Sequence, residues 1–278
     1  MNILTTISLR VLLIAGVFAL ALTALYLHDG AVGITFALED DLDLTIGSSA
    51  SRNGVPVPGS SWALKDMVPG ADKFFDLDNV LPGDFGEATV SMLVASRREG
   101  GAWLCLDFAN LASDENEFIE PEEGIDQNGA LSGELAEGME FFAWRDDGDN
   151  VFESGEDPLF GPAPASDVLD GSHAIADATT GAAVAVGATH NIGIAWCAGN
   201  LGVNLATGDT VCNGGALGSE AQTDALSVDI AIRAQLERGS EGFTCSGETL
   251  PDGRERPERP DRPDRSRTER PERGSSQE

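Results

Sequence analysis

The sequence predicts an all-β protein whose antiparallel strands form a sandwich or a barrel. Residues 225–236 give the clearest signal, because apolar and polar side chains alternate there over twelve positions, as in a strand with one buried face. Other short apolar segments are separated by turn residues such as Pro82, Gly83 and Gly86. A long pattern of helical period is missing from the sequence, and the segment 131–138 is the single weak candidate for a helix.

The first 37 residues are expected to form a hydrophobic leader helix that exports the chain. Arg10 is the only basic residue before a largely apolar run from Val11 to Leu27, which is longer than the core of a usual signal peptide and nearly long enough to span a bilayer. Thr35 and Ala37 fit the small residues of a cleavage site. We expect cleavage after Ala37, with an uncleaved membrane anchor as the alternative, and a domain outside the cytoplasm.

Residues 38–61 combine one isolated strand pattern with a linker. Leu42, Leu44 and Ile46 alternate with polar residues, and a stretch rich in Gly, Ser and Pro at 47–61 separates them from the later strands. Such a strand either closes its own sheet or is free to be donated to another copy of the chain.

Residues 62–253 are expected to form the sandwich. Besides 225–236, strands are predicted at 87–95, 102–109, 139–144 and 190–196. Four cysteines fit an exported protein, because disulfides persist outside the cytosol. The favoured pairs are Cys197 with Cys212, which closes a Gly- and Asn-rich excursion, and Cys105 with Cys245, which ties a middle strand to the domain end. Zinc binding is the alternative, although the sequence contains no CxxC pair.

The last segment, 254–278, repeats arginine, acidic residues and proline, and contains no apolar residue other than proline. Such a composition cannot bury surface, so we expect a disordered tail that is a spacer, a weak contact or inert. Its eight arginines balance seven acidic residues. Residues 38–253 therefore carry 8 basic and 39 acidic residues, so the whole acidic excess behind the formal net charge of −30 lies there.

This acidic excess argues against nucleic acid as a partner, because nucleic-acid binding needs a basic surface. Lys65 and Lys73 are the only lysines in the chain. Such a composition favours a protein adapted to high salt, where repulsion between its charges is screened. A soluble acidic protein without that adaptation is the alternative.

The run 146–156 (DDGDNVFESGE) is the most concentrated set of oxygen ligands in the sequence. Calcium takes about six to eight hard oxygen ligands, and the expected ones here are Asp147, Asp149, the Val151 carbonyl, and Glu153 or Glu156. The run departs from an EF-hand because its sixth position is not glycine. A solvated acidic turn is the alternative, and a second acidic segment at 114–123 is a weaker candidate.

Catalytic patterns are largely missing from the sequence, which contains no HExxH, no GxSxG and no GK dipeptide of a phosphate loop. His173 and His190 are expected to be ordinary polar residues. The many carboxylates leave glycoside hydrolysis as an alternative, but no pair stands out from the charged surface. We therefore expect neither metalloprotease nor glycosidase activity.

Several strings occur in an order that resembles a known family. After a leader ending in GITFALEDD come LPGDFGEATVSMLV, WLCLDFANLASDENEFIEPE, GELAEGMEFFAWRDDGDNVFESGE, GIAWC and EAQTDALSVDIAIRAQLERGSEGFTC. In order and spacing they are similar to the TasA/camelysin family of secreted matrix proteins, in its archaeal branch. The resemblance covers most of residues 38–245 and does not cover the tail.

This resemblance implies an antiparallel jelly-roll-like β-sandwich with long acidic loops that polymerises into filaments of a biofilm matrix. Subunits of that family join by donor-strand complementation, which would assign the donor strand to Leu42, Leu44 and Ile46. The implied partners are further copies of the chain, in a head-to-tail homopolymer, and a SipW-type signal peptidase. The alternative is a membrane-tethered or secreted calcium-binding adhesive module that does not polymerise.

Overall fold

The computed structural model describes residues 41–68, 71–75, 77, 79–115, 124–125, 133–221 and 223–246, together with the backbone of 33–37. The expected leader up to residue 32, the expected tail at 254–278 and the acidic residues 116–123 lie outside the described residues. Within the described part of the chain, no helix has the length and apolar character needed to cross a membrane.

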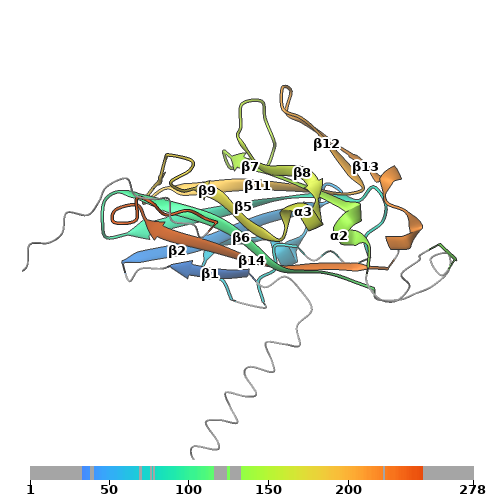
Figure 1. Cartoon of the computed structure of the whole chain (residues 1–278), viewed down its shortest axis with the longest axis horizontal. Coiled ribbons are helices and arrows are strands. Elements are labelled where there is room, and N and C mark those ends of the chain that lie inside the picture. Colours follow the sequence, from blue (N-terminus) through green and yellow to red (C-terminus); the bar gives the residue numbers. More distant parts are fainter. Residues whose placement is uncertain are drawn as a thin grey trace, which may run out of the picture.

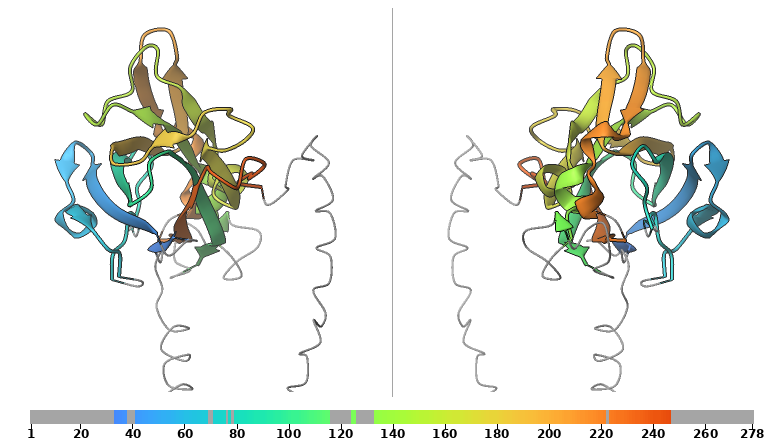
Figure 2. Two further views of the ribbon diagram at one scale, coloured as in Figure 1. Left: turned by 90° about the vertical axis from the view of Figure 1, so that its left-hand side faces the viewer. Right: turned by 90° about the vertical axis from the view of Figure 1, so that its right-hand side faces the viewer.

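The described chain is a β-sandwich of two sheets (Figures 1 and 2). The larger sheet has the order β3 (Val55–Pro56), β2 (Leu42–Arg52), β5 (Phe85–Ser96), β11 (Thr189–Ala198), β7 (Met139–Asp146) and β8 (Pro158–Pro164), and β4 (Trp62–Lys65) also pairs with β2. The smaller sheet has the order β1 (Gly33–Ala37), β14 (Ala225–Leu236), β6 (Gly101–Asp114) and β10 (Val184–Ala185), and β9 (Gly171–Ala176) also pairs with β6.

Short elements complete the fold. A hairpin of β12 (Asn200–Asn204) and β13 (Asp209–Asn213) projects from the sandwich (Figure 2). The helical turns are α2 (Leu135–Gly138), α3 (Ala165–Val168), η1 (Pro58–Ser60), η3 (Gly214–Ala216) and η4 (Ser219–Ala221). The weak helix prediction at 131–138 corresponds to the single turn α2.

The chain crosses between the two sheets from β5 to β6, from β6 to β7, from β8 to β9 and from β10 to β11, whereas β2 and β5 lie in the same sheet. The resulting orders β5–β11–β7–β8 and β14–β6–β9 are those of a jelly roll. The position beside β14, where a jelly roll places its first strand, is occupied by β1. This strand runs parallel to β14, whereas every other pairing between described strands is antiparallel.

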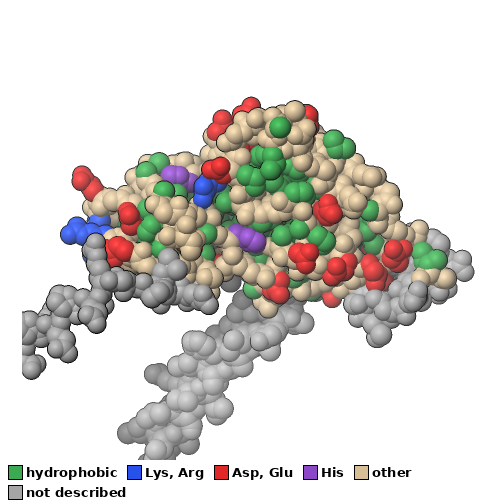
Figure 3. Space-filling model, turned by 45° about the horizontal axis from the view of Figure 1, so that its top comes forward, with side chains coloured by type: hydrophobic (Ala, Val, Ile, Leu, Met, Phe, Trp, Pro, Cys, Tyr) green, Lys and Arg blue, Asp and Glu red, His purple; other side chains and the backbone are tan. Residues whose placement is uncertain are grey.

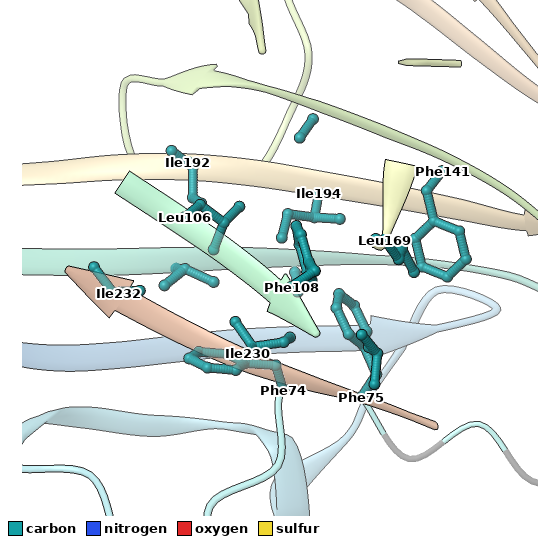
Figure 4. Close-up of a cluster of buried hydrophobic side chains, with 14 of the residues drawn as sticks. Phe74, Phe75, Leu106, Phe108, Phe141, Leu169, Ile192, Ile194, Ile230 and Ile232 are labelled. Atoms are coloured by element: carbon teal, nitrogen blue, oxygen red, sulfur yellow. The ribbon is translucent and has the colours of Figure 1, made fainter. Parts of the chain in front are cut away.

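The core lies between the sheets and confirms the predicted alternation in β14. Its six even-numbered side chains from Leu226 to Leu236 are buried, while its odd-numbered ones are partly exposed. Figure 4 shows side chains of both sheets converging there, among them Leu106 and Phe108 of β6, Ile192 and Ile194 of β11, and Ile230 and Ile232 of β14. Burial of apolar area at this interface is the main favourable term in folding.

All five strand segments predicted in the sandwich lie in strands, namely β5, β6, β7, β11 and β14. Sequence patterns missed β8, β9 and the β12–β13 hairpin. These strands are five to seven residues long and all contain Gly, Pro or Asn, so they lack a run of alternating apolar residues long enough to detect.

Both disulfides are the ones favoured from the sequence. Cys105 of β6 is bonded to Cys245, with Cα atoms 5.5 Å apart, and Cys197 is bonded to Cys212, with Cα atoms 5.4 Å apart. No cysteine is free, so the zinc alternative has no thiolate ligands.

Asp177 holds the chain end that carries Cys245. Its Oδ2 accepts a hydrogen bond from the Cys245 N–H (2.9 Å), and its Oδ1 accepts from the N–H groups of Thr179 (2.8 Å) and Thr180 (3.1 Å). Burial opposes ionisation of this side chain, but the hydrogen bonds from Thr179, Cys245 and Thr180 outweigh it and lower the pKa of Asp177. The ionised carboxylate therefore stabilises the folded state.

The surface is acidic, and Figure 3 shows carboxylate side chains spread over the face in view with few basic ones among them. The basic residues Arg52, Lys65, Arg98, Arg145 and Arg233 each form an ion pair, with Asp84, Asp72, Asp41, Asp157 and Asp107 respectively. The exposed pairs among them, such as Arg98 with Asp41, contribute about 0–1 kcal/mol each, whereas Arg233 with Asp107 is partly buried. They do not offset the acidic excess of the domain.

The two disulfides are expected to differ in their effect on stability. The Cys105→Ala/Cys245→Ala variant, which opens a loop with a sequence separation of 140, should lose about 4–5 kcal/mol in the chain-entropy estimate. The Cys197→Ala/Cys212→Ala variant opens a separation of 15 and should lose about 3 kcal/mol. Urea unfolding in molar salt measures both values. A larger loss in the second variant would contradict the entropic explanation.

Asp177 should contribute stability only where it is ionised. The Asp177→Asn variant is expected to be less stable at pH 7 by about 1–3 kcal/mol, because buried N–H donors lose a charged acceptor. Since the folded-state pKa of Asp177 is lowered, the difference from wild type should shrink as pH falls below about 4. Urea unfolding at pH 7 and pH 3 tests this, with the exposed Asp170→Asn as control. A difference that is equal at both pH values would refute the role of the charge.

Candidate functional site

The outer edge of β14 is the first candidate site. On its other side β14 pairs with β6 along nearly its whole length. On the outer side, the described partners are β1, which covers Ile230–Ala234, and Leu77, which bridges to Leu226. A strand of twelve residues is thus paired at this edge over five positions by β1 and at one by Leu77. Figure 1 shows β1 running beside β14 at this edge.

The segment predicted as a donor strand closes its own sheet in the structure. Leu42, Leu44 and Ile46 lie in β2, where they are 6 %, 5 % and 0 % exposed. The strand pairs with β5 at every position from Leu42 to Arg52 and with β3 and β4 on its other side. Of the two possibilities left open by the sequence, the described chain adopts the first.

Polar contacts hold β2 at both ends and in its middle. Asp41 pairs with Arg98 at 2.6 Å, and Arg52 pairs with Asp84 at 2.7 Å. Near the middle, the Trp62 Nε1–H donates to the Ile46 carbonyl at 3.2 Å. Burial raises the pKa of Asp84, but hydrogen bonds from Arg52, Leu81 and Asn53 outweigh this effect and lower it overall. Removing β2 from its sheet would therefore break many contacts at once.

The position of β1 bears on the expected leader boundary. Gly33 to Ala37 were assigned to the leader, yet the structure places their backbone in the smaller sheet. Cleavage after Ala37 would remove this strand and leave residues Ile230–Ala234 of β14 without a described partner on that side. The fold is thus most complete when the chain begins at or before Gly33.

The acidic loop after β7 is the second candidate site. Carboxylate oxygens of Asp146, Asp147 and Asp149 lie within 4.8 Å of one another. The structure brings together the predicted ligands Asp147 and Asp149 and adds Asp146, which was not among the predicted ligands. Glu153 and Glu156 lie outside this group of three. Val151 is 53 % exposed, and its N–H donates to Asp149 Oδ1 at 2.9 Å.

Glu156 closes the loop through backbone hydrogen bonds. Its Oε1 accepts from the Asp147 N–H at 3.2 Å, and its Oε2 accepts from the Glu153 N–H at 2.8 Å. Desolvation raises the pKa of Glu156, and the neighbouring charges of Asp146 and Asp147 raise it further against these hydrogen bonds. Glu156 thus has a structural role in shaping the loop.

An apolar anchor fixes the loop on the sandwich. Phe152 is 4 % exposed and packs edge-on against Phe142 and Trp144, with ring centroids 4.9 Å and 5.6 Å apart. These residues belong to a small second core with Ala195, Cys197 and Leu201. The loop is therefore attached at Phe152 as well as at its two ends.

A second group of carboxylates joins residues distant in sequence. Oxygens of Glu115, Glu134 and Asp224 lie within 4.8 Å of one another, and Asp224 is fully buried. The Asp224 Oδ2 accepts a hydrogen bond from the Glu134 N–H at 2.5 Å. Glu115 belongs to the weaker acidic segment at 114–123, so the structure connects that segment to the start of β14.

The two histidines that the structure describes, His173 and His190, make structural contacts. His173 Nε2 lies 2.7 Å from the Val168 carbonyl, and its ring packs against Phe108 and Phe160. His190 Nε2 lies 2.9 Å from the Ala185 carbonyl. Neither contact joins a histidine to a nucleophile or to a carboxylate.

Comparison with known proteins adds no relative, since neither a protein-family model nor a curated protein matches the chain.

Proposed function

We propose that the protein is a secreted structural subunit of extracellular filaments, in which an N-terminal strand of one copy completes the sheet of the next. The observation that supports this most is the edge of β14, where a short strand from the chain's N-terminal side fills the first position of the jelly roll. A strand from a second copy can make the same main-chain hydrogen bonds.

The two N-terminal strands differ in how easily they can be exchanged. Release of β1 breaks five registered pairs with β14, which is its single partner among the described strands. Release of β2 breaks eleven pairs with β5, those with β3 and β4, and the burial of Leu42, Leu44 and Ile46. The geometry therefore favours β1 over the predicted β2 segment as the exchanged strand.

This assignment carries a requirement for processing. The strand Gly33–Ala37 has to remain in the mature chain, so a SipW-type signal peptidase would cut before Gly33 and not after Ala37. Exchange between identical copies is head-to-tail and does not close on itself, which is the condition for fibre growth.

Two further features fit an exported subunit that works in concentrated salt. The paired disulfides suit an oxidising environment. The formal charge of −30 makes identical copies repel one another in dilute buffer, and molar salt shortens the range of this repulsion to about 3 Å. Polymerisation is therefore expected to need high salt.

The test compares leaderless chains that begin at Gly33 with a variant in which Ile34 and Thr35 are both replaced by proline. Adjacent N–H groups of a strand point to opposite sides, so one of these prolines removes a hydrogen bond toward β14. Electron microscopy and sedimentation in molar salt should detect filaments for the parent chain and monomers for the variant. A chain that lacks residues 274–278, outside the described fold, is the control and should polymerise.

Three other outcomes have defined meanings. A parent chain that is folded but monomeric at every salt concentration would reject the filament function and leave the non-polymerising adhesive module. Filaments from the proline variant would reject β1; if deletion of residues 38–46 then abolishes them while circular dichroism shows an intact fold, Leu42, Leu44 and Ile46 are restored as the donor strand. Filaments that survive both changes would reject strand exchange by the N-terminal segment.

A further inference from the structure

The carboxylate of Asp146 has one oxygen that the fold does not satisfy. The residue ends β7 and is only 7 % exposed. Its Oδ2 accepts hydrogen bonds from the Thr89 hydroxyl at 3.1 Å and from the Asn150 N–H at 3.3 Å. Its Oδ1 is buried and has no hydrogen-bond partner in the structure. A buried carboxylate oxygen without a partner is costly, so a bound ligand that contacts Oδ1 would stabilise the folded state.

The residues around Asp146 add further negative charge and few groups that could balance it. Asp147 and Asp149 place further carboxylate oxygens within 4.8 Å. Thr89 lies 2.7 Å from Asn150 Oδ1 and 3.1 Å from Asp146 Oδ2, and its single hydroxyl proton can serve only one of these oxygens at a time. The ion pairs found in the described part of the chain involve none of the three aspartates.

We propose that Asp146, Asp147 and Asp149 bind one calcium ion. Three carboxylates supply hard oxygen ligands, and the exposure of Asp147 and Asp149 leaves room for water molecules at the remaining positions. The group contains neither histidine nor cysteine, so zinc and copper are poor candidates. Magnesium demands near-ideal octahedral geometry and gives up its water ligands reluctantly, whereas calcium accepts several carboxylate oxygens in irregular geometry.

This site differs from the one predicted from the loop sequence. Glu156 is held by the Asp147 and Glu153 N–H groups. In the proposed site, Asp146 at the end of β7 takes the place of the predicted ligand Glu153 or Glu156. Asp146 also contacts Thr89 of β5. A calcium ion here would therefore join the end of β7 to β5 and to the loop that Phe152 anchors on the second core.

The test is calcium titration of the secreted, disulfide-bonded protein after treatment with chelator, at constant molar NaCl. Isothermal titration calorimetry should give a site that is weakened about tenfold or more in Asp146→Asn. Calcium should raise the melting temperature of the wild type and not that of the variant. The matched control is Asp170→Asn, which makes the same charge change at an exposed residue and should bind calcium like the wild type.

A second variant keeps the test decisive if Asp146→Asn folds poorly. Asp147→Asn/Asp149→Asn changes two exposed residues and should lose the same site while its melting temperature with chelator stays near that of the wild type. Equal calcium affinity and stoichiometry in all variants would overturn the proposal. So would a wild type that responds equally to calcium, magnesium and added NaCl, because the loop would then be an ordinary solvated turn.

Discussion

The fold depends on the packing of β14, because two faces and two backbone edges of this strand all have to be satisfied at once. Its even-numbered side chains fill the core between the sheets, and one backbone edge pairs with β6. On its outer face, Arg233 forms an ion pair with Asp107 of β6 and donates to the Cys245 carbonyl at 2.8 Å. The remaining edge cannot be left open without inviting another strand. In the structure, the N-terminal strand β1 covers part of this edge.

Charge sets the second condition on the molecule. The described basic residues are largely engaged in local pairs, such as Arg52 with Asp84 and Lys65 with Asp72. They therefore leave most of the negative charge of the domain uncompensated at its surface. Any assembly of identical copies has to bring these excesses together, which high ionic strength permits. A bound divalent cation at Asp146 would reduce the same excess locally and hold the loop without enlarging the core.

The elements that could be predicted from the sequence are those in which one strand carries the whole signal. In β14 the alternation of six apolar positions is visible without any partner. The cysteines allow three connectivities, of which the favoured one is formed. By contrast, β1 is hidden because its residues GITFA continue the apolar composition of the leader. Asp146 was not predicted as a candidate ligand because its contacts with Thr89 of β5 and with Asn150 cannot be seen in the sequence. Likewise, the sequence shows that Glu156 lies close to Asp147 and Asp149 along the chain. It does not show that backbone N–H groups already bond to both Glu156 carboxylate oxygens.

The parallel register of β1 gives any filament built in this way a polarity. Gly33 lies opposite Ile230 and Ala37 lies opposite Ala234, so the chain that continues from β1 leaves at the Leu236 end of β14. A donating subunit would therefore always sit beyond that end of its acceptor, and all copies would point in one direction. One tip of the filament would present an unfilled β14 edge, and the other would present an unplaced β1. Growth and capping at the two tips would then be chemically different reactions.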